Sequence, residues 1–166
     1  MTERAARHAA EGVLRAKVLT VSDGVIAGTR EDSSGAAIAE ALEGHGFAVV
    51  ERKQIPDGAM EVAAALEMMS AGFLGLIATT GGTGFGPRDE TPEGTRMVLE
   101  RDAPGLAEAM RLVSPLGRLS RGIAGTREMA LVCNLPGSRS GALECLEAII
   151  DVVPHALDLI GGGHPH

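Results

Sequence analysis

Residues 73–93 of the chain read FLGLIATTGGTGFGPRDETPE. The run over 73–79 is almost entirely apolar, which is typical of a strand buried on both faces of a sheet. Glycines follow at positions 81, 82, 84 and 86, and Thr91-Pro92 is a helix-start signal, with Thr as the N-cap and Pro at N1. We therefore predict a buried strand, a glycine-rich loop and a helix, in this order.

Apolar runs and helical spacings alternate on both sides of this stretch. Further strands are predicted over 17–21, 47–55 and 129–134. Further helices are predicted over 35–43 (capped by Ser33 or Ser34), between Gly58 and Gly72, over 105–113 after an interruption at Pro104, over 140–153, and from Pro154 to 160. Residues 114–128 read as a loop. The alternation predicts an α/β fold with helices on both faces of a mainly parallel sheet.

Length and composition limit the class of protein. The 166 residues suit one domain, over 15–163, with a mobile N-terminal arm over 1–14. The chain has no Trp, no Tyr and three Phe, so its core must be aliphatic. A net charge of −7 and the lack of aromatic side chains argue against nucleic acid as a partner.

The sequence also predicts where the protein works. No apolar run approaches the ~20 residues of a membrane span, and the N-terminus has no apolar signal core, so we expect a cytoplasmic protein that does not bind membranes. Cys133 and Cys145 lie in apolar runs, and their spacing fits neither a redox pair nor a zinc site. We expect both to be buried thiols.

Three loops leave the ends of predicted strands: residues 22–24, 80–89 and 135–138. In parallel sheets, ligands bind beyond the carboxyl ends of the strands, so these loops should meet at one edge. The glycine-rich loop over 80–89 would let backbone N–H groups approach phosphate oxygens. It is neither a P-loop nor a dinucleotide fingerprint, and a tight strand–helix connection is the alternative.

Two aspartates near these loops suggest a metal. A carboxylate beside a phosphate cradle would repel phosphate unless a cation lay between them, and Asp57 and Asp89 together could hold one Mg²⁺. The alternatives are that Asp57 is a turn residue and that Asp89 favours the following helix dipole. Arg88 and Arg121 would then pair with surface acids.

Five ordered motifs together carry a family resemblance. They are TVSDGVIAGTREDSSG (20–35), IPDG (55–58), TTGGTGFGPRDETPE (79–93), SRGIAGTR (120–127) and NLPGS (134–138). They closely resemble the bacterial molybdenum cofactor family that includes the proteins called MogA and MoaB, whose domain recurs in plant Cnx and animal gephyrin proteins. The resemblance covers about residues 15–160, nearly the whole chain.

The resemblance implies a three-layer α/β/α domain, trimeric or, in the MoaB branch, hexameric. It implies adenylylation of molybdopterin by ATP with Mg²⁺ and release of pyrophosphate, and the pathway's molybdenum insertase as a further partner. The family's two essential aspartates fall on Asp57 and Asp89, which would also hold the Mg²⁺. The residues that would line the pterin and nucleotide pocket are Ser22, Asp23, Thr80, Gly81, Gly82, Thr83, Gly84, Ser120, Arg121, Asn134, Pro136, Gly137 and Ser138.

Glu90 departs from the family pattern, because relatives usually carry an apolar residue there. We expect its carboxylate to face solvent, since helix N-termini tolerate acids. Two other functions stay open on the sequence alone. One is a non-catalytic, pterin-binding or assembly protein of the MoaB branch, and the other is a nucleotide pyrophosphatase on the same fold, as in CinA-type proteins.

Overall fold

The computed structural model describes residues 12–163, so most of the predicted arm over 1–14 lies outside the described residues. The strands are β1 (Arg15–Val21), β2 (Ala48–Ile55), β3 (Gly75–Thr80), β4 (Arg101–Asp102), β5 (Ala124–Arg127) and β6 (Ala130–Leu135). The helices are α2 (Asp23–Ile26), α3 (Ser33–Gly44), α4 (Ala59–Ser70), α5 (Thr91–Val98), α6 (Pro104–Arg111), the 3-10 helix η1 (Pro115–Leu119), α7 (Arg139–Glu147) and α8 (Val153–Ile160).

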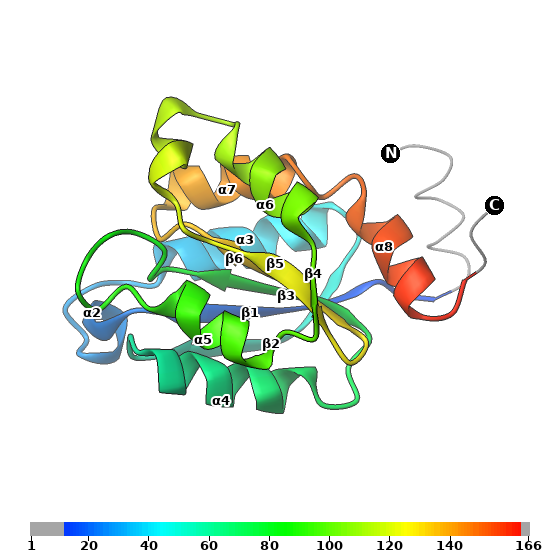
Figure 1. The fold of residues 1–166 in the computed structure, drawn as a ribbon, viewed down its shortest axis with the longest axis horizontal. Helices are drawn as coiled ribbons and strands as arrows, with labels where there is room; N and C mark the ends of the chain where they lie inside the picture. The colour runs from blue at the N-terminus through cyan, green and yellow to red at the C-terminus, as the bar shows by residue number, and fades with distance from the viewer. Residues whose placement is uncertain (1–11, 164–166) are drawn as a thin grey trace.

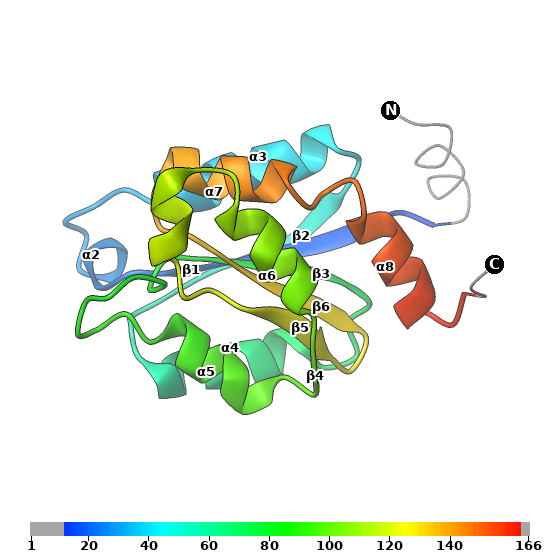
Figure 2. The same ribbon diagram turned by 45° about the horizontal axis from the view of Figure 1, so that its top comes forward.

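The strands form one sheet in the order β2-β1-β3-β6-β5-β4. Neighbours from β2 to β6 are parallel, whereas β5 is antiparallel to β6 and β4 is antiparallel to β5. Helices α4 and α5 cover one face, and α3, α6 and α7 cover the other (Figures 1 and 2). The predicted α/β fold, with helices on both faces of a mainly parallel sheet, is confirmed.

Alternation along the central strands builds a core on each face of the sheet. Val18 of β1 packs in the core beneath α3, α7 and α8, while its neighbour Leu19 packs in the core beneath α4. In β3, Leu76 packs in the same core as Val18 and Ile77 packs in the same core as Leu19, because successive side chains of a strand point to opposite faces. Both cores are aliphatic apart from Phe47 and Phe73, as the composition predicts.

The prediction that residues 114–128 form a loop is wrong. They contain η1 and the strand β5, whose sequence AGTR has no apolar pattern and depends on antiparallel pairing with β6. Pro104 begins α6 rather than interrupting a helix, because a short strand, β4, separates α5 from α6. The predicted helix over 140–153 is also wrong in extent: α7 ends at Glu147, and the bend after it buries both Ile149 and Ile150.

Two predicted helix caps are wrong because other groups compete for them. Asp32, not Ser33 or Ser34, caps α3, and its carboxylate accepts hydrogen bonds from the backbone of Gly35 and from the hydroxyl of Thr20. The N-cap of α5 is Glu90, because Thr91 lies inside the helix and its hydroxyl donates to the carbonyl of Gly81 at 2.8 Å.

Both cysteine thiols are buried, as predicted. Burial raises the pKa of Cys133 to about 12 and that of Cys145 to about 11. Within residues 12–163, no helix combines the length and the hydropathy that a membrane span needs.

Helices α4 and α5 approach each other closely at Gly94. A Cβ atom added there would collide with the carbonyl oxygen of Ala59 and would lie 2.7 Å from Cβ of Val62. Gly105, in the first turn of α6, has nothing within 4 Å of the same position. The two helical glycines therefore differ in packing but not in secondary structure.

We expect Gly94→Ala to lower the free energy of unfolding by about 1–3 kcal/mol, because the helices must move apart. The matched variant Gly105→Ala should be neutral or stabilising by up to about 1 kcal/mol, since it only gains helix propensity. Urea denaturation of both variants measures these changes. Equal stability of the two variants would contradict the close approach.

Candidate functional site

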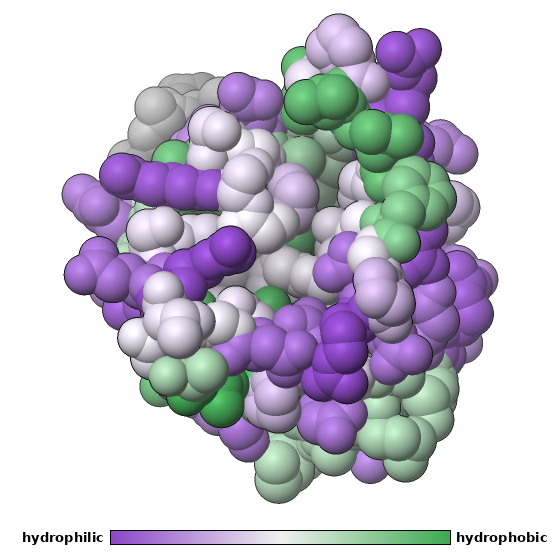
Figure 3. All heavy atoms as spheres, turned by 90° about the vertical axis from the view of Figure 1, so that its left-hand side faces the viewer, coloured by the Kyte–Doolittle hydropathy of each residue, from purple (hydrophilic) through white to green (hydrophobic). Residues whose placement is uncertain are grey.

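A cavity of about 820 Å³ opens at the carboxyl edge of the parallel strands. It lies at the end of the sheet marked by α2, and Figure 3 shows the hollow from that side. All the predicted site residues except Asp23 and Arg121 line it: Ser22, Asp57, Thr80, Gly81, Gly82, Thr83, Gly84, Asp89, Ser120, Asn134, Pro136, Gly137 and Ser138. The loops after β1, β2, β3 and β6 thus meet at one edge.

The glycine-rich loop crosses the end of β1 at very short range. Gly81 and Gly82 have φ angles of 100° and 67°, in the left-handed region that favours glycine. A Cβ atom at Gly81 would also collide with the carbonyl oxygen of Val21. The loop is held from behind, because the backbone of Thr91 donates to the carbonyl of Gly82 at 3.0 Å.

Asp57 and Asp89 approach the cavity from different loops. A Cβ atom at Gly82 would lie 3.2 Å from Oδ1 of Asp57, and one at Gly84 would lie 3.0 Å from Oδ2 of Asp89. The glycine-rich loop therefore passes over both carboxylates. Burial raises the pKa of Asp57, and the negative charges of Asp23 and Asp89 act in the same direction.

The two carboxylates would suit a cation that is shared with a ligand. Within residues 12–163, no group of three or more His, Cys, Asp or Glu side chains could hold a metal by itself. Mg²⁺ commonly uses one or two carboxylates and takes its other ligands from substrate phosphates and water. Asp57 and Asp89 fit that pattern. The negative charge of Asp89 helps to raise the pKa of Asp57, and a cation between the two carboxylates would offset this repulsion.

Asp23 does not line the cavity. Its backbone N–H donates to Oδ2 of Asp57 at 2.8 Å, and its own carboxylate accepts from the backbone of Asp57 at 3.1 Å. The hydrogen bond from Arg88, at 2.9 Å from Nε to Oδ2, holds the pKa of Asp23 below its usual value. Asp23 therefore fixes the turn that carries Asp57.

Arg121 also lies outside the cavity, and it braces the glycine-rich loop. Its guanidinium pairs with Glu93, and it donates to the carbonyl oxygens of Gly84 and Asp89. The pairing expected for Arg88 and Arg121 is therefore present, with Asp23 and Glu93 as partners. Both pairs hold the loop that carries Asp89.

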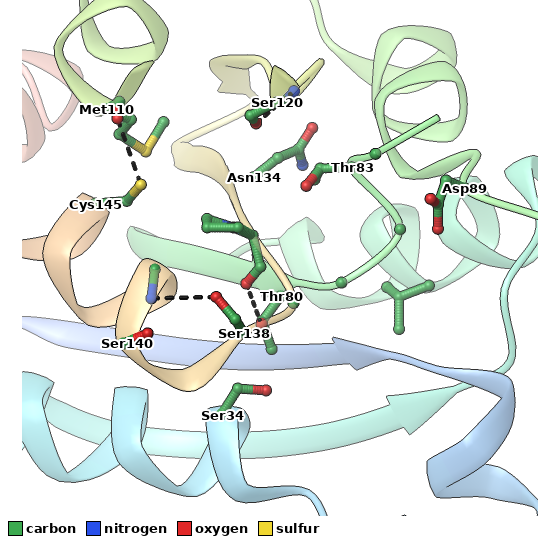
Figure 4. A pocket seen from close by; sticks show the side chains of 18 of the residues that line it. Ser34, Thr80, Thr83, Asp89, Met110, Ser120, Asn134, Ser138, Ser140 and Cys145 are labelled. Atoms are coloured by element: carbon green, nitrogen blue, oxygen red, sulfur yellow. Dashed lines mark hydrogen bonds between the residues drawn. The ribbon is translucent and has the colours of Figure 1, made fainter. Parts of the chain in front are cut away.

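Asn134 lies at the cavity wall, but its amide is engaged within the protein. Nδ2 donates to the hydroxyls of Thr79 and Thr95, each at 3.0 Å, and Oδ1 accepts from the backbone of Ile123 at 3.1 Å. Thr80 likewise donates to the carbonyl of Pro136, a bond drawn in Figure 4. These side chains shape the cavity by fixing β3, β6 and α5 around it.

Sequence reasoning missed one whole wall of the cavity. It is formed by α6, η1 and α7, and Figure 4 places Met110 and Cys145 at the opposite end of the view from Asp89. The missed lining residues include Ala107, Met110, Arg111, Val113, Leu116, Leu119, Glu144 and Cys145 on this wall, Arg30 and Glu31 before α3, and Ser33 and Ser34 in its first turn. The motif over 20–35 carried a signal for the second group, whereas nothing in residues 104–119 stood out.

The arrangement is that of α/β proteins that bind a small molecule beyond the carboxyl ends of parallel strands. The chain belongs to the family described as "Probable molybdopterin binding domain", whose model matches residues 17–155. The resemblance inferred from the sequence motifs is thereby confirmed.

Relatives of this family match nearly the whole chain. The molybdopterin adenylyltransferase of Helicobacter pylori J99 is 37% identical over 159 residues, covering 89% of this chain and 88% of the relative. That of Escherichia coli K12 is 32% identical over 168 residues, covering 90% and 86%. Among solved structures, the molybdopterin biosynthesis enzyme MoaB of Thermus thermophilus is 47% identical, with a TM-score of 0.85 over 90% of this chain and 97% of that one.

We expect Asn134→Ala to lower the free energy of unfolding by about 1–3 kcal/mol, because it removes the partner of buried polar groups on three segments. Ser140→Ala, an exposed change on the rim of the same cavity, should stay within about 0.5 kcal/mol of the parent. Chemical denaturation without ligand checks both. If the two variants were equally stable, the amide would not have the bracing role described.

Proposed function

We propose that the chain catalyses the adenylylation of molybdopterin in molybdenum cofactor biosynthesis. The terminal phosphate of the pterin attacks the α-phosphorus of ATP, the bond from that phosphorus to the β-phosphate oxygen breaks, and pyrophosphate leaves. Two relatives named molybdopterin adenylyltransferase align with 89% and 90% of the chain. The observation that carries the proposal is that Asp57, Asp89 and the glycine-rich loop line one cavity.

The cavity suits two phosphate-bearing substrates. Its volume of about 820 Å³ lies within the range of ~300–1,000 Å³ that is common for ligand sites. In this proposal, the backbone N–H groups of Gly82, Thr83 and Gly84 orient phosphate oxygens at the loop end. The apolar wall that contains Met110 and Leu116 offers a surface for a flat heterocycle.

Phosphate attacking phosphate must overcome charge repulsion. In this proposal, Asp57 and Asp89 would hold the Mg²⁺ of Mg-ATP, which supplies neutralisation of charge on the transferring phosphoryl group. The chain's own part is to orient the two phosphates in line and to keep solvent out. Little proton transfer is needed, so the reaction requires no histidine at the site.

We expect pyrophosphate release from Mg-ATP to require molybdopterin, and Asp89→Asn to lower its rate by at least about 100-fold with the fold intact. The exposed Asp151→Asn, between α7 and α8, is a matched control that should keep the parent rate. A coupled pyrophosphate assay gives the rates, and circular dichroism checks the fold. A near-normal rate for Asp89→Asn would refute the metal assignment, whereas pterin binding without any release would favour the non-catalytic alternative.

The same proposal includes self-association. Large apolar side chains are exposed near the cavity wall, with Leu112 at 85%, Leu116 at 75% and Phe85 at 71% of their full accessibility. Figure 3 shows apolar side chains gathered along one side of the hollow. Patches of this kind commonly mark interaction surfaces. We propose that the chain forms a homotrimer or homohexamer. We further propose that this assembly acts in the cytoplasm and supplies its product to the pathway's insertase.

We expect light scattering coupled to size-exclusion chromatography to give a mass three or six times that of the 17.0 kDa chain. Leu116→Glu should shift this mass downward, because a charge would have to be buried in the contact. The exposed Met68→Glu on α4 is the control, and it should leave the mass unchanged. A monomeric mass for the parent would contradict the assembly.

A further inference from the structure

The two side chains that flank Asp89 both contact the turn that carries Asp57. Arg88 donates from Nη2 to the carbonyl oxygen of Asp57 at 2.8 Å. Glu90 accepts at Oε2 from the backbone N–H of Ala59 at 3.1 Å. Neither Arg88 nor Glu90 lines the cavity, whereas Asp89 between them does.

Glu90 supplies a cap that α4 lacks. The N-cap residue of α4 is Gly58, which has no side chain and a φ of 137°. A first-turn N–H of this helix would otherwise have no protein acceptor, and the Glu90 carboxylate reaches it from a segment 31 residues away. The expectation that Glu90 faces solvent is therefore wrong, since the residue is half-buried and engaged.

Arg88 connects its own loop to the start of α2 and to the turn that carries Asp57. Its guanidinium grips the carboxylate of Asp23 with two hydrogen bonds, at 2.9 and 3.1 Å, while also binding the backbone of Asp57. Asp23 and Asp57 are themselves cross-linked by two reciprocal backbone-to-carboxylate bonds. A planar fork of donors suits this task, and a lysine would supply only part of it.

The charges at this place would otherwise drive the loops apart. Asp23 begins α2, whereas Asp57 and Asp89 lie in two different loops and line one cavity. Like charges that approach each other destabilise the arrangement. The Arg88 guanidinium partly offsets this repulsion and is 61% exposed. An exposed ion pair adds little to overall stability, so a positioning role accounts for the contacts better than a stabilising one.

We propose that Arg88 and Glu90 are positioning residues that staple the loop bearing Asp89 to the turn bearing Asp57, and so set the separation of the two carboxylates. This inference rests on the proposed adenylylation and names two further residues that the reaction depends on. Because neither Arg88 nor Glu90 lines the cavity, we assign them no contact with substrate. They act through Asp57 and Asp89.

The contact between Glu90 and the Ala59 amide can be measured without an activity assay. Hydrogen exchange at the Ala59 amide, followed by nuclear magnetic resonance, should be at least about 10-fold faster in Glu90→Ala than in the parent. Glu90→Gln keeps an acceptor oxygen and should restore most of the protection. An equal exchange rate in the parent and in Glu90→Ala would overturn the contact.

Kinetics test the consequence for the reaction. In Arg88→Ala and Glu90→Ala we expect kcat to fall on the order of 10- to 100-fold, with the KM for molybdopterin within about twofold of the parent. Arg88→Lys and Glu90→Gln should recover part of kcat. Arg101→Ala, an exposed arginine on β4 outside the cavity, is the control and should behave as the parent. An unchanged kcat, or a loss explained wholly by a lower folded fraction, would overturn the positioning role.

A binding measurement separates this inference from the proposed function. Calorimetric titration with ATP in the presence of Mg²⁺ needs no pterin and no turnover. If the parent released no pyrophosphate, the proposed function would fail, and the titration would still decide the inference. Several-fold weaker Mg²⁺-dependent ATP binding in Arg88→Ala and Glu90→Ala would support the staple, and equal binding in all variants would overturn it.

Discussion

The close passage of Gly81 beneath the carbonyl of Val21 sets the shape of this molecule's binding edge. Because glycine has no Cβ atom, the chain can leave β3 and turn directly across the end of β1, where any other residue would collide with the backbone. The hydroxyl of Thr91 then binds the carbonyl of Gly81, which returns the chain to the start of α5. The floor of the cavity is thereby fixed by contacts within the protein, independently of any ligand.

Most of the fold follows from patterns that are local in the sequence. Apolar runs such as 73–79 identify the buried strands, and glycine or proline at their ends identifies the turns. The elements that could not be predicted are those that depend on distant partners. Strand β5 has small and polar residues and forms because β6 offers it an antiparallel edge. Asp32 is the N-cap of α3 because Thr20 and Gln54 also donate hydrogen bonds to its carboxylate and fix its position.

The site was predictable in place but not in the role of each side chain. Topology brings the three strand-end loops together, so residues such as Ser22, Thr83 and Ser138 could be assigned to one cavity. Asp57 lies outside these loops and was assigned to the site through the family resemblance. Sequence could not say which polar atoms are already engaged. The Asn134 amide is held by Thr79 and Thr95, which lie 55 and 39 residues away. The wall from α6 and η1 escaped notice because its residues, although a helix was predicted over 105–113, carry no motif that indicates ligand binding.

The aliphatic core has a practical optical consequence. The chain contains no Trp and no Tyr, and two of its three Phe side chains, Phe47 and Phe73, are buried. The protein is therefore almost transparent in the near ultraviolet, where purine and pterin rings absorb strongly. A heterocycle in the cavity would be seen in absorbance or circular dichroism against almost no protein background. Occupancy of the site can thus be followed directly, without a label and without altering any residue.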